Sequence, residues 1–406
     1  MDSKNPKKTV YNSEIGALIN KKSILELLYS HQEISRASIA NMTGLTRPSI
    51  TNIIRQFLEC GLVIEMRKAE SGSGRRQQLL GINPKAFNVV ALEIERSYTK
   101  FSIFNSIGQK LHEIKNNTPV NVCEKSFKDF LFRGMNKLIV DSNVRKTDIF
   151  CCSIGIPGPV DTRKGIARVP NDLENFKEFN LNFPIKSMFE NEYEIETFID
   201  NDANCSSLSE KWFGIGNRFK NYIFLTSDLF GLGSGIVLEG EVYRGSLYSV
   251  GEIGHTIIEE GKHNFVKLEK KTGFKNLAYM LNENYGISTT KEDIINSKIR
   301  ITEDKYPIIA NELGTYVGIA IINLINLFGP ELVVIGGKLL DFYHSIESKY
   351  NGQFSKCVYS SNKPTIMKAT LGYDAGIFGV VALAYEKLIS KPEKLIKKSL
   401  ENKNNG

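Results

Sequence analysis

The sequence lacks several features that would assign a class of protein directly. Its six cysteines form no Cys-x-x-Cys pair, and the adjacent Cys151 and Cys152 lie in an apolar run. Buried free thiols are therefore expected, and neither a zinc site nor a disulfide framework is indicated. No uninterrupted apolar run reaches the roughly 18 residues of a membrane span, and the first eight residues lack the apolar core of a signal peptide. These absences predict a cytoplasmic protein.

The positive charge of the chain is concentrated in its first fifth. Residues 1–87 carry 13 Lys/Arg against 7 Asp/Glu, whereas residues 88–406 carry 39 against 38. Such an excess at one end is typical of a nucleic-acid-binding module joined to a nearly neutral body. The 406 residues leave room for two or three domains. We expect a DNA-binding domain over 1–85, a second domain over 86–395 and a basic flexible tail over 396–406.

Two short helices with the same start signal follow each other in the basic region. Ser35 and Thr46 are favourable N-caps, each flanked by an apolar pair that can form a hydrophobic staple, and Gly44 makes the turn between the helices. The second helix has an apolar face at helical spacing, formed by Ile50, Ile53, Ile54, Phe57 and Leu58. Thr51, Asn52, Arg55 and Gln56 fall on the opposite face, with Arg47 and Ser49 near the N-terminal end. This pattern predicts a helix-turn-helix whose second helix enters the major groove of double-stranded operator DNA.

A basic hairpin follows the two helices. Residues 62–66 and 77–82 read as two strands, and the glycine-containing tip between them carries Arg75 and Arg76. We expect these arginines at a minor groove or on phosphates, as in the wing of a winged helix-turn-helix. A three-helix packing module with a solvated surface is the alternative. Charge, caps, periodicity and wing together favour DNA binding.

The rest of the chain alternates strand-like and helical segments, which predicts an α/β body of two lobes with a cleft. Its most distinctive stretch is rich in glycine and then presents a carboxylate and an imidazole. Gly231, Gly233 and Gly235 would let backbone amides approach a bound oxygen, and Glu252 and His255 could reach one polar ligand together. On the glycines alone, a plain hairpin followed by a surface turn is the simpler interpretation.

Four motifs in this body resemble, in the same order, those of the ROK family of repressors, open reading frames and sugar kinases. They are Ile-Gly-Ile-Pro-Gly-Pro-Val-Asp at 154–161, Asn-Asp-Ala-Asn at 201–204, Gly-Glu-Ile-Gly-His at 251–255 and Val-Ile-Gly-Gly at 334–337. The wing resembles that of the repressor branch. The resemblance extends from about residue 15 to 388. It implies an actin-like (sugar kinase / ribonuclease H-like) fold of two α/β lobes behind the winged helix, assembled as a homodimer or homotetramer.

The resemblance also implies a sugar-binding site. Asp202 matches the catalytic base of the kinases, and a helix N-cap is its alternative role. Further positions match sugar-hydroxyl ligands or line the family's pocket: Gly158, Asn171, Asn201, Glu252, His255 and Asn276. Asn276 stands where the family usually has a glutamate, so sugar preference can differ from that of the glucose-type members. A ring of such groups rejects ligands that lack a matching hydroxyl.

Three departures from the kinases favour a regulator. Glu95 stands in the place of a glycine in the first phosphate loop, and Asp228 and Phe230 stand in the later one, where charge and bulk oppose a nucleotide. The zinc motif that normally follows is replaced by residues 263–274, which contain no cysteine. We therefore expect no zinc, no ATP and no catalytic activity, with Asp202 as a vestigial base.

The sequence thus predicts a sugar-responsive transcriptional regulator that represses genes for carbohydrate uptake or metabolism. Its partners would be operator DNA and a monosaccharide or sugar-phosphate effector, without a membrane. A ROK-type ATP-dependent sugar kinase with an added DNA-binding head is the alternative, supported by Asp202. An orphan DNA-binding or scaffold protein with an empty cleft is the third possibility.

Overall fold

A computed structural model of the chain describes residues 13–68, 77–119, 123–168, 183–261, 264–295, 298–359 and 363–404. The chain forms two compact units. One consists of Met1–Asn88, Asn105–Gln109 and Tyr385–Gly406, and the other of Val89–Phe104 and Lys110–Ala384. We call them the head and the body. The chain therefore passes between head and body four times, and not once as a simple two-domain order would have it.

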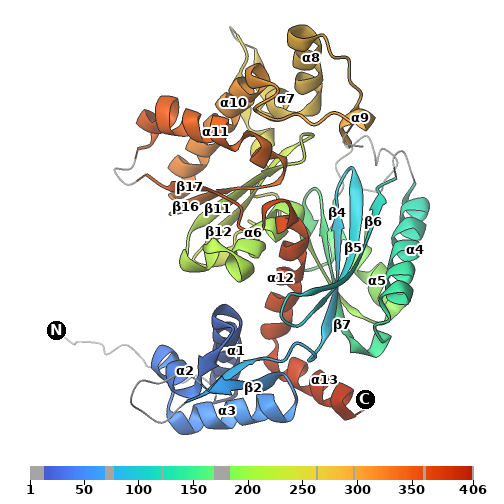
Figure 1. The fold of residues 1–406 in the computed structure, drawn as a ribbon, viewed down its shortest axis with the longest axis vertical. Helices are drawn as coiled ribbons and strands as arrows, with labels where there is room; N and C mark the ends of the chain where they lie inside the picture. Colours follow the sequence, from blue (N-terminus) through green and yellow to red (C-terminus); the bar gives the residue numbers. More distant parts are fainter. Residues whose placement is uncertain are drawn as a thin grey trace, which may run out of the picture. The chain divides into compact units, whose positions relative to one another are not determined.

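The head contains the predicted helix-turn-helix and hairpin (Figure 1). Its elements are α1 (Ser13–His31), β1 (Ile34–Ser35), α2 (Arg36–Thr43), α3 (Arg47–Glu59), β2 (Val63–Lys68), β3 (Gln78–Ile82) and α13 (Pro392–Asn404). Both predicted caps are confirmed: Ser35 Oγ accepts a hydrogen bond from the Ser38 amide, and Thr46 Oγ1 accepts one from the Ser49 amide. Gly44 adopts φ +68°, the left-handed conformation that glycine tolerates. The strands form a sheet in the order β1-β3-β2, with β2 and β3 antiparallel.

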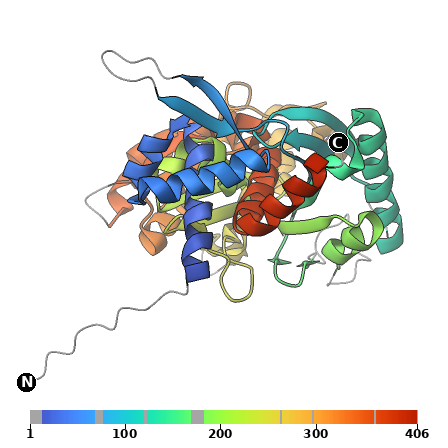
Figure 2. The same ribbon diagram turned by 90° about the horizontal axis from the view of Figure 1, so that it is seen from below.

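The C-terminal segment corrects one prediction. Residues 396–406 were expected to be a flexible tail, but residues 392–404 form helix α13. This helix lies beside α1 and α3 within the head (Figures 1 and 2). Leu395 and Ser399, four residues apart, are buried on one side of it, and Lys21 Nζ on α1 lies 2.5 Å from Glu393 Oε1. The Lys/Asn-rich composition conceals this helical spacing, which explains the wrong prediction.

The body contains two five-stranded sheets, one in each lobe. The first has the order β10-β7-β4-β5-β6 and the second the order β13-β12-β11-β16-β17. The strands of the first are β4 (Asn88–Ile94), β5 (Tyr98–Asn105), β6 (Lys110–Asn117), β7 (Ile149–Ile156) and β10 (Glu196–Asn201). Those of the second are β11 (Tyr222–Ser227), β12 (Leu232–Leu238), β13 (Glu241–Val242), β16 (Leu332–Ile335) and β17 (Thr365–Lys368).

Helices and short strands complete the body. The helices are α4 (Glu124–Ser142), α5 (Ile185–Tyr193), α6 (Asp202–Phe213), α7 (Glu269–Thr272), α8 (Phe274–Tyr285), α9 (Lys291–Ile295), α10 (Pro307–Phe328), α11 (Tyr343–Lys349) and α12 (Ala375–Ile389). The short strands are β8 (Val160–Asp161), β9 (Ile166–Ala167), β14 (Ile257–Glu259) and β15 (Phe265–Lys267). Strands alternate with helices in both lobes, so the predicted α/β body with two lobes is confirmed.

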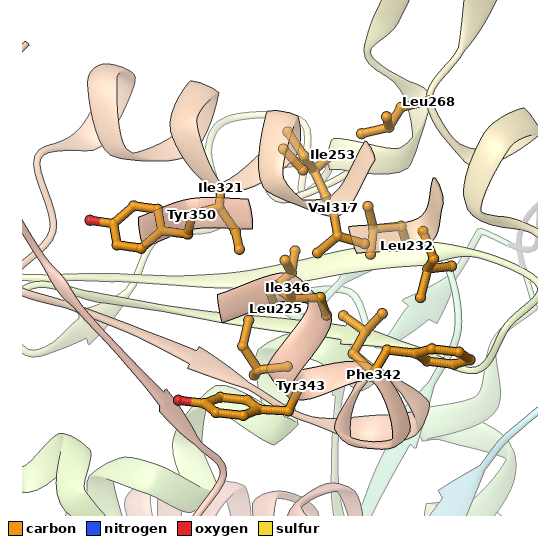
Figure 3. Packing of buried hydrophobic residues seen from close by; sticks show 14 of the residues in the cluster. Leu225, Leu232, Ile253, Leu268, Val317, Ile321, Phe342, Tyr343, Ile346 and Tyr350 are labelled. Carbon is orange, nitrogen blue, oxygen red and sulfur yellow. The ribbon is translucent and has the colours of Figure 1, made fainter. Parts of the chain in front are cut away.

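Helix α10 is the centre of the second lobe's core. Its Val317 and Ile321 are fully buried together with Leu225 of β11, Leu232 of β12 and Ile346 of α11 (Figure 3). By length and composition α10 is also the one described helix that could cross a membrane. Its residues from Ile309 to Ile325 are largely buried inside the protein, which is the pattern of a core helix in a folded body. This core fixes the sheet edge from which the β11–β12 turn projects.

Candidate functional site

The outer face of α3 carries a hollow that collects most of the predicted DNA-contacting residues. Its volume is about 410 Å³, and it is lined by Arg47, Pro48, Thr51, Asn52 and Arg55. All five are exposed, whereas Ile50, Ile53, Ile54 and Phe57 on the opposite face are buried. The sequence analysis missed Pro48, although its spacing of three and four residues from Thr51 and Asn52 could have placed it here.

Hydrogen bonds within α3 orient these side chains. Asn52 Oδ1 accepts a hydrogen bond from Arg55 Nη2 at 2.6 Å, and Arg55 Nε lies 3.9 Å from Glu59 Oε1. The Thr51 hydroxyl donates to the Arg47 carbonyl oxygen. Arg55 is thus held between two neighbours on its own helix, which prepares its fork of donors for a planar acceptor such as a guanine edge.

Two predicted DNA contacts, Ser49 and Asn52, have side chains that bind neighbours on the chain, and two others cannot be placed. The Ser49 hydroxyl lies 2.9 Å from Thr46 Oγ1, and Ser49 belongs to the cap of α3 and does not line the hollow. Asn52 lines the hollow but directs its amide oxygen to Arg55 and not outward. Arg75 and Arg76 lie outside the described residues.

In the body, the start of α6 joins two of the predicted sugar ligands. Asn201 Oδ1 accepts hydrogen bonds from the Ala203 and Asn204 amides, so Asn201 is the N-cap of α6. Asp202 is the next residue, and its Oδ1 also accepts a hydrogen bond from the Ala203 amide at 2.8 Å. Asn201 Nδ2 donates to the Gly158 carbonyl oxygen at 3.0 Å. Gly158 adopts φ +91°, which a side chain would strain. The Asn201 amide therefore fixes the turn after β7 against the start of α6.

Asp200 supports this turn from below. It is almost fully buried, accepts hydrogen bonds from the Asn201 amide and Asn204 Nδ2 on one oxygen, and accepts from Arg244 Nε at 2.9 Å on the other. Arg244 lies just after β13 in the other sheet's chain segment. Sequence reasoning missed both residues because Arg244 belongs to no motif and its partner is 44 residues away.

Asp202 is the first residue of α6 and is half-buried. Its pKa is raised to about 7, first by burial and then by the negative charges of Asp228 and Glu252; the Ala203 amide and Arg96 lower it. Those influences show that Asp202, Asp228, Glu252 and Arg96 share one electrostatic environment. A carboxyl group with a pKa near neutrality can accept a proton from, or hydrogen-bond to, a sugar hydroxyl.

Glu252 and His255 lie on a turn that is tied to β12. The Ser234 amide donates to the Gly251 carbonyl oxygen at 2.9 Å, and a Cβ on Gly251 would collide with the Ser234 carbonyl oxygen. His255 is exposed, and its Nε2 lies 3.6 Å from Glu269 Oε1 on α7. Glu269 belongs to the segment that replaces the zinc motif and also lies 3.7 Å from Lys267 Nζ. His255 thus faces the Glu269 carboxylate, which also lies close to Lys267.

The side chain of one further predicted ligand is directed elsewhere, and another cannot be placed. The Asn276 amide donates to the Lys271 carbonyl oxygen at 2.9 Å and to Glu312 Oε1 at 3.3 Å, which directs it toward α7 and α10. Asn171 lies outside the described residues. The structure therefore groups Gly158, Asn201, Asp202 and Glu252, with His255 at the exposed end of the turn.

The place of the first phosphate loop is occupied by paired acidic residues. Glu93 is 5% exposed, and its Oε2 lies 3.0 Å from Lys100 Nζ. Glu95 accepts a hydrogen bond from the Tyr98 hydroxyl at 2.7 Å. Burial, followed by the charge of Glu93, raises the pKa of Glu95 to about 8. Glutamate side chains and Lys100 thus fill the place where a P-loop has the open glycine backbone that binds phosphates.

Head and body together define a class: a two-lobe α/β ligand-binding protein with a winged-helix DNA-binding domain. The ROK family model matches residues 89–387, and a model described as winged helix-turn-helix DNA-binding matches residues 18–64. The chain therefore belongs to the ROK family. Its DNA-binding head makes it a transcriptional regulator of that family.

Known proteins of similar length support this assignment. A putative xylose repressor from Caldicellulosiruptor sp. (strain Rt8B.4) is 30% identical over 343 residues, which cover 79% of this chain and 83% of that protein. The DNA-binding transcriptional dual regulator NagC from Escherichia coli (strain K12) is 26% identical over 399 residues, covering 93% and 95%. The crystal structure of a ROK family transcriptional regulator, a homologue of the E. coli MLC protein, has a TM-score of 0.74 at 22% identity and covers 95% and 99%. The predicted actin-like fold behind a winged helix is confirmed.

Proposed function

We propose that the chain represses genes of carbohydrate uptake or metabolism and that a sugar bound in the cleft of its body changes its affinity for operator DNA. The observation that carries this proposal is the face of α3, where Arg47, Thr51, Asn52 and Arg55 line one exposed hollow. No part of an enzymatic reaction needs such a face. Two heads in a homodimer or homotetramer would place two copies of α3 in successive major grooves of a palindromic site.

The effector that fits the cleft best is a neutral monosaccharide. Asp202 and Glu252 offer carboxylate acceptors, His255 offers an imidazole, and Asn201 has a second amide hydrogen besides the one bound to Gly158. A sugar phosphate would add negative charge next to Asp202, Asp228 and Glu252, which electrostatics disfavours. Xylose and N-acetylglucosamine are the first sugars to test, because relatives are named xylose repressor and N-acetylglucosamine repressor.

The proposed mechanism is a shift between two arrangements of the lobes. A ligand moves such an equilibrium only through its different affinity for the two states, and a roughly hundredfold difference supplies about 2.7 kcal/mol. Because the chain passes between body and head at four points, a change in the body has four covalent routes to the head. We propose that neither ATP nor zinc takes part, and that the protein acts in the cytoplasm.

The test is operator binding with and without sugar. The site would be selected from random double-stranded DNA and its affinity measured by fluorescence anisotropy at several salt concentrations. Xylose, N-acetylglucosamine and their phosphates would then be titrated into the complex. A sugar that changes the apparent operator Kd by about tenfold or more supports the proposal. A sugar that binds the protein without altering operator affinity contradicts it.

A sugar kinase with a DNA-binding head is the second candidate. One observation favours it: the raised pKa of Asp202, about 7, suits a base that works near neutrality. ATP consumption that depends on sugar and disappears in Asp202→Asn would establish this function. No ATP consumption by a preparation that binds the sugar would leave the regulator as the explanation.

A further inference from the structure

The β11–β12 turn of the body binds its own carboxylate. Asp228 Oδ1 accepts hydrogen bonds from the Phe230 amide at 2.8 Å and the Gly231 amide at 2.9 Å. Successive backbone amides that converge on one point form an anion-binding concavity. In this chain an aspartate of the same turn already occupies that concavity.

The other oxygen of Asp228 faces a cation from the opposite lobe. Arg96 belongs to the turn between β4 and β5 of the first sheet, and its Nε lies 3.7 Å from Asp228 Oδ2. The guanidinium also lies over the glycine of the second turn, because a Cβ on Gly231 would come within 3.1 Å of Arg96 Nη2. Both side chains are largely shielded, with 21% of Arg96 and 28% of Asp228 exposed. The two turns thus meet through one ion pair and one close backbone contact.

Further contacts hold the β11–β12 turn in this shape. Ser227 Oγ donates to the Gly231 carbonyl oxygen and accepts from the Leu229 amide. Leu229 is buried and adopts φ +71°, which a non-glycine residue takes only where its surroundings require it. Phe230 packs against Phe274 with ring centroids 5.5 Å apart. The turn is therefore prearranged around the carboxylate and does not wait for a ligand to order it.

We infer that Asp228 is a built-in anion that takes the place of a nucleotide phosphate: it satisfies the two turn amides and bridges to Arg96 across the lobes. This clasp, Arg96–Asp228, excludes phosphate ligands by filling their site, and it joins the lobes without a nucleotide. The inference deepens the proposed function, on which it rests for the absence of an ATP-dependent reaction. The raised pKa of Asp202, to which Asp228 contributes, agrees with the clasp lying beside the sugar ligands.

The inference predicts a latent phosphate site. Asp228→Gly removes the carboxylate that the two turn amides and Arg96 face, whereas Asp228→Asn removes the charge but keeps an oxygen that can accept from the amides. The full-length protein and each variant would be titrated with inorganic phosphate, and separately with ATP and Mg²⁺, by calorimetry. We expect no measurable phosphate binding by the unaltered chain, a gain of about tenfold or more in Asp228→Gly, and a smaller gain in Asp228→Asn. Adding Arg96→Ala to Asp228→Gly should remove the gain.

Asp293 provides a matched control. It accepts a hydrogen bond from the Thr290 amide at 3.0 Å and lies 3.1 Å from Lys298 Nζ, so it too is an aspartate that binds a backbone amide and a cation. It lies on α9 and not in the β11–β12 turn. Asp293→Asn should leave phosphate binding unchanged. Equal phosphate binding by the unaltered chain and Asp228→Gly would overturn the inference, as would a gain that survives Arg96→Ala. If Asp228→Gly does not fold, Asp228→Asn decides, and no gain over the unaltered chain refutes the clasp.

The two proposals fail in different ways. If the unaltered chain bound operator and responded to sugar but Asp228→Gly gained no phosphate affinity, only the clasp would be wrong. If the unaltered chain bound ATP and consumed it with a sugar, the regulator proposal and the clasp would both be wrong. Sugar binding without any effect on operator affinity, together with the expected phosphate gain, would reject the regulator proposal and leave the clasp.

Discussion

The exposed face of α3 and the group of carboxyl residues around Asp202 are both polar, but they are built in opposite ways. On α3 the polar residues are exposed and are oriented by neighbours three or four residues away, as Arg55 is by Asn52 and Glu59. In the body the corresponding residues are partly or fully buried and have partners from distant segments, as Asp200 has in Arg244. The first surface is formed by one helix, and the second depends on the arrangement of two lobes.

Charge separates the two regions further. The outward groups of α3 are guanidinium, hydroxyl and amide groups, and arginine keeps its charge throughout the range in which proteins are stable. The cleft is rich in carboxyl groups, and burial and mutual repulsion raise the pKa of Asp202 to about 7 and of Glu95 to about 8. Proton concentration near neutrality should therefore act on these carboxyl groups of the body and leave the charge of the α3 arginines unchanged.

The largest effect is expected at the buried Glu93–Lys100 ion pair of the body. Lys100→Met would leave the Glu93 carboxylate buried without its cation, and breaking such a pair costs about 3–5 kcal/mol. Burial already raises the pKa of Glu93, and Lys100 opposes that rise. Urea unfolding would measure the loss of free energy of unfolding.

Two controls sharpen this prediction. Lys110→Met removes a comparable ion pair, Lys110–Glu113, whose side chains are both 28% exposed, and should cost less than about 1 kcal/mol. The double variant Glu93→Leu/Lys100→Met removes both charges and should recover most of the stability. A Lys100→Met protein as stable as Lys110→Met would show that the pair is unimportant to the body.

The second effect concerns the helix that replaced the expected tail. Leu395 is 3% exposed on α13, so Leu395→Ala should destabilise the head by about 2–5 kcal/mol through lost burial and the cavity left behind. Hydrogen exchange of amides in α1 and α3 would report this locally. Lys397 on the exposed side of α13 is the control, and Lys397→Ala should have little effect. Equal hydrogen exchange in Leu395→Ala and Lys397→Ala would instead support a flexible C-terminal tail.

The third effect tests the recognition face. Arg55→Ala should weaken binding to the selected operator by about 1–3 kcal/mol, roughly 5- to 150-fold, and should relax the preference for one base pair. If Asn52 acts by orienting Arg55, then Asn52→Ala/Arg55→Ala will cost no more than Arg55→Ala alone in a double-mutant cycle. Arg145→Ala, which removes a surface arginine of the body, is the control. Additive losses would instead give Asn52 its own contact with DNA.

The contrast between the two regions also explains which features could be predicted from the sequence. The caps at Ser35 and Thr46, the apolar face of α3 and the exposed Arg55 depend on residues within one or two helical turns, so periodicity and capping rules reach them. The Asn201 turn was also predictable as a motif. Which role Asn201 and Asp202 each take at the start of α6 was not, because both can cap a helix and only the backbone decides.

The partners of the cleft could not be predicted for a different physical reason. Arg96 and Asp228 are 132 residues apart in number and meet only when two separate sheets have formed. Arg244 reaches Asp200 in the same way. The Asn276 amide donates to the Lys271 carbonyl oxygen and to Glu312 Oε1, two contacts that no local pattern encodes. The tail failed because composition outweighed the spacing of Leu395 and Ser399.

The last prediction concerns the pH dependence of stability that the carboxyl groups of Asp202 and Glu95 produce. Because the pKa of Asp202 is higher in the folded chain than its ordinary value of 3.8, the folded state keeps a proton that the unfolded chain loses. The stability from this group is complete below that ordinary value and disappears as the pH rises through about 7. Glu95 acts in the same direction, up to about 8. The protein should therefore lose stability, by this contribution, between about pH 4 and pH 8.

Asp202→Asn should flatten this part of the pH dependence, because the amide cannot titrate, and Asp202→Asn/Glu95→Gln should flatten it further. The measurement is the midpoint of thermal unfolding across that range, with Asp304→Asn, a substitution at an exposed surface aspartate, as the control. A slope that persists in the double variant would place the titrating groups elsewhere in the body. A flattened slope with unchanged operator affinity would establish that protons act on the sensor and not on the recognition helix, and it would make pH a variable to fix in every measurement of the sugar response.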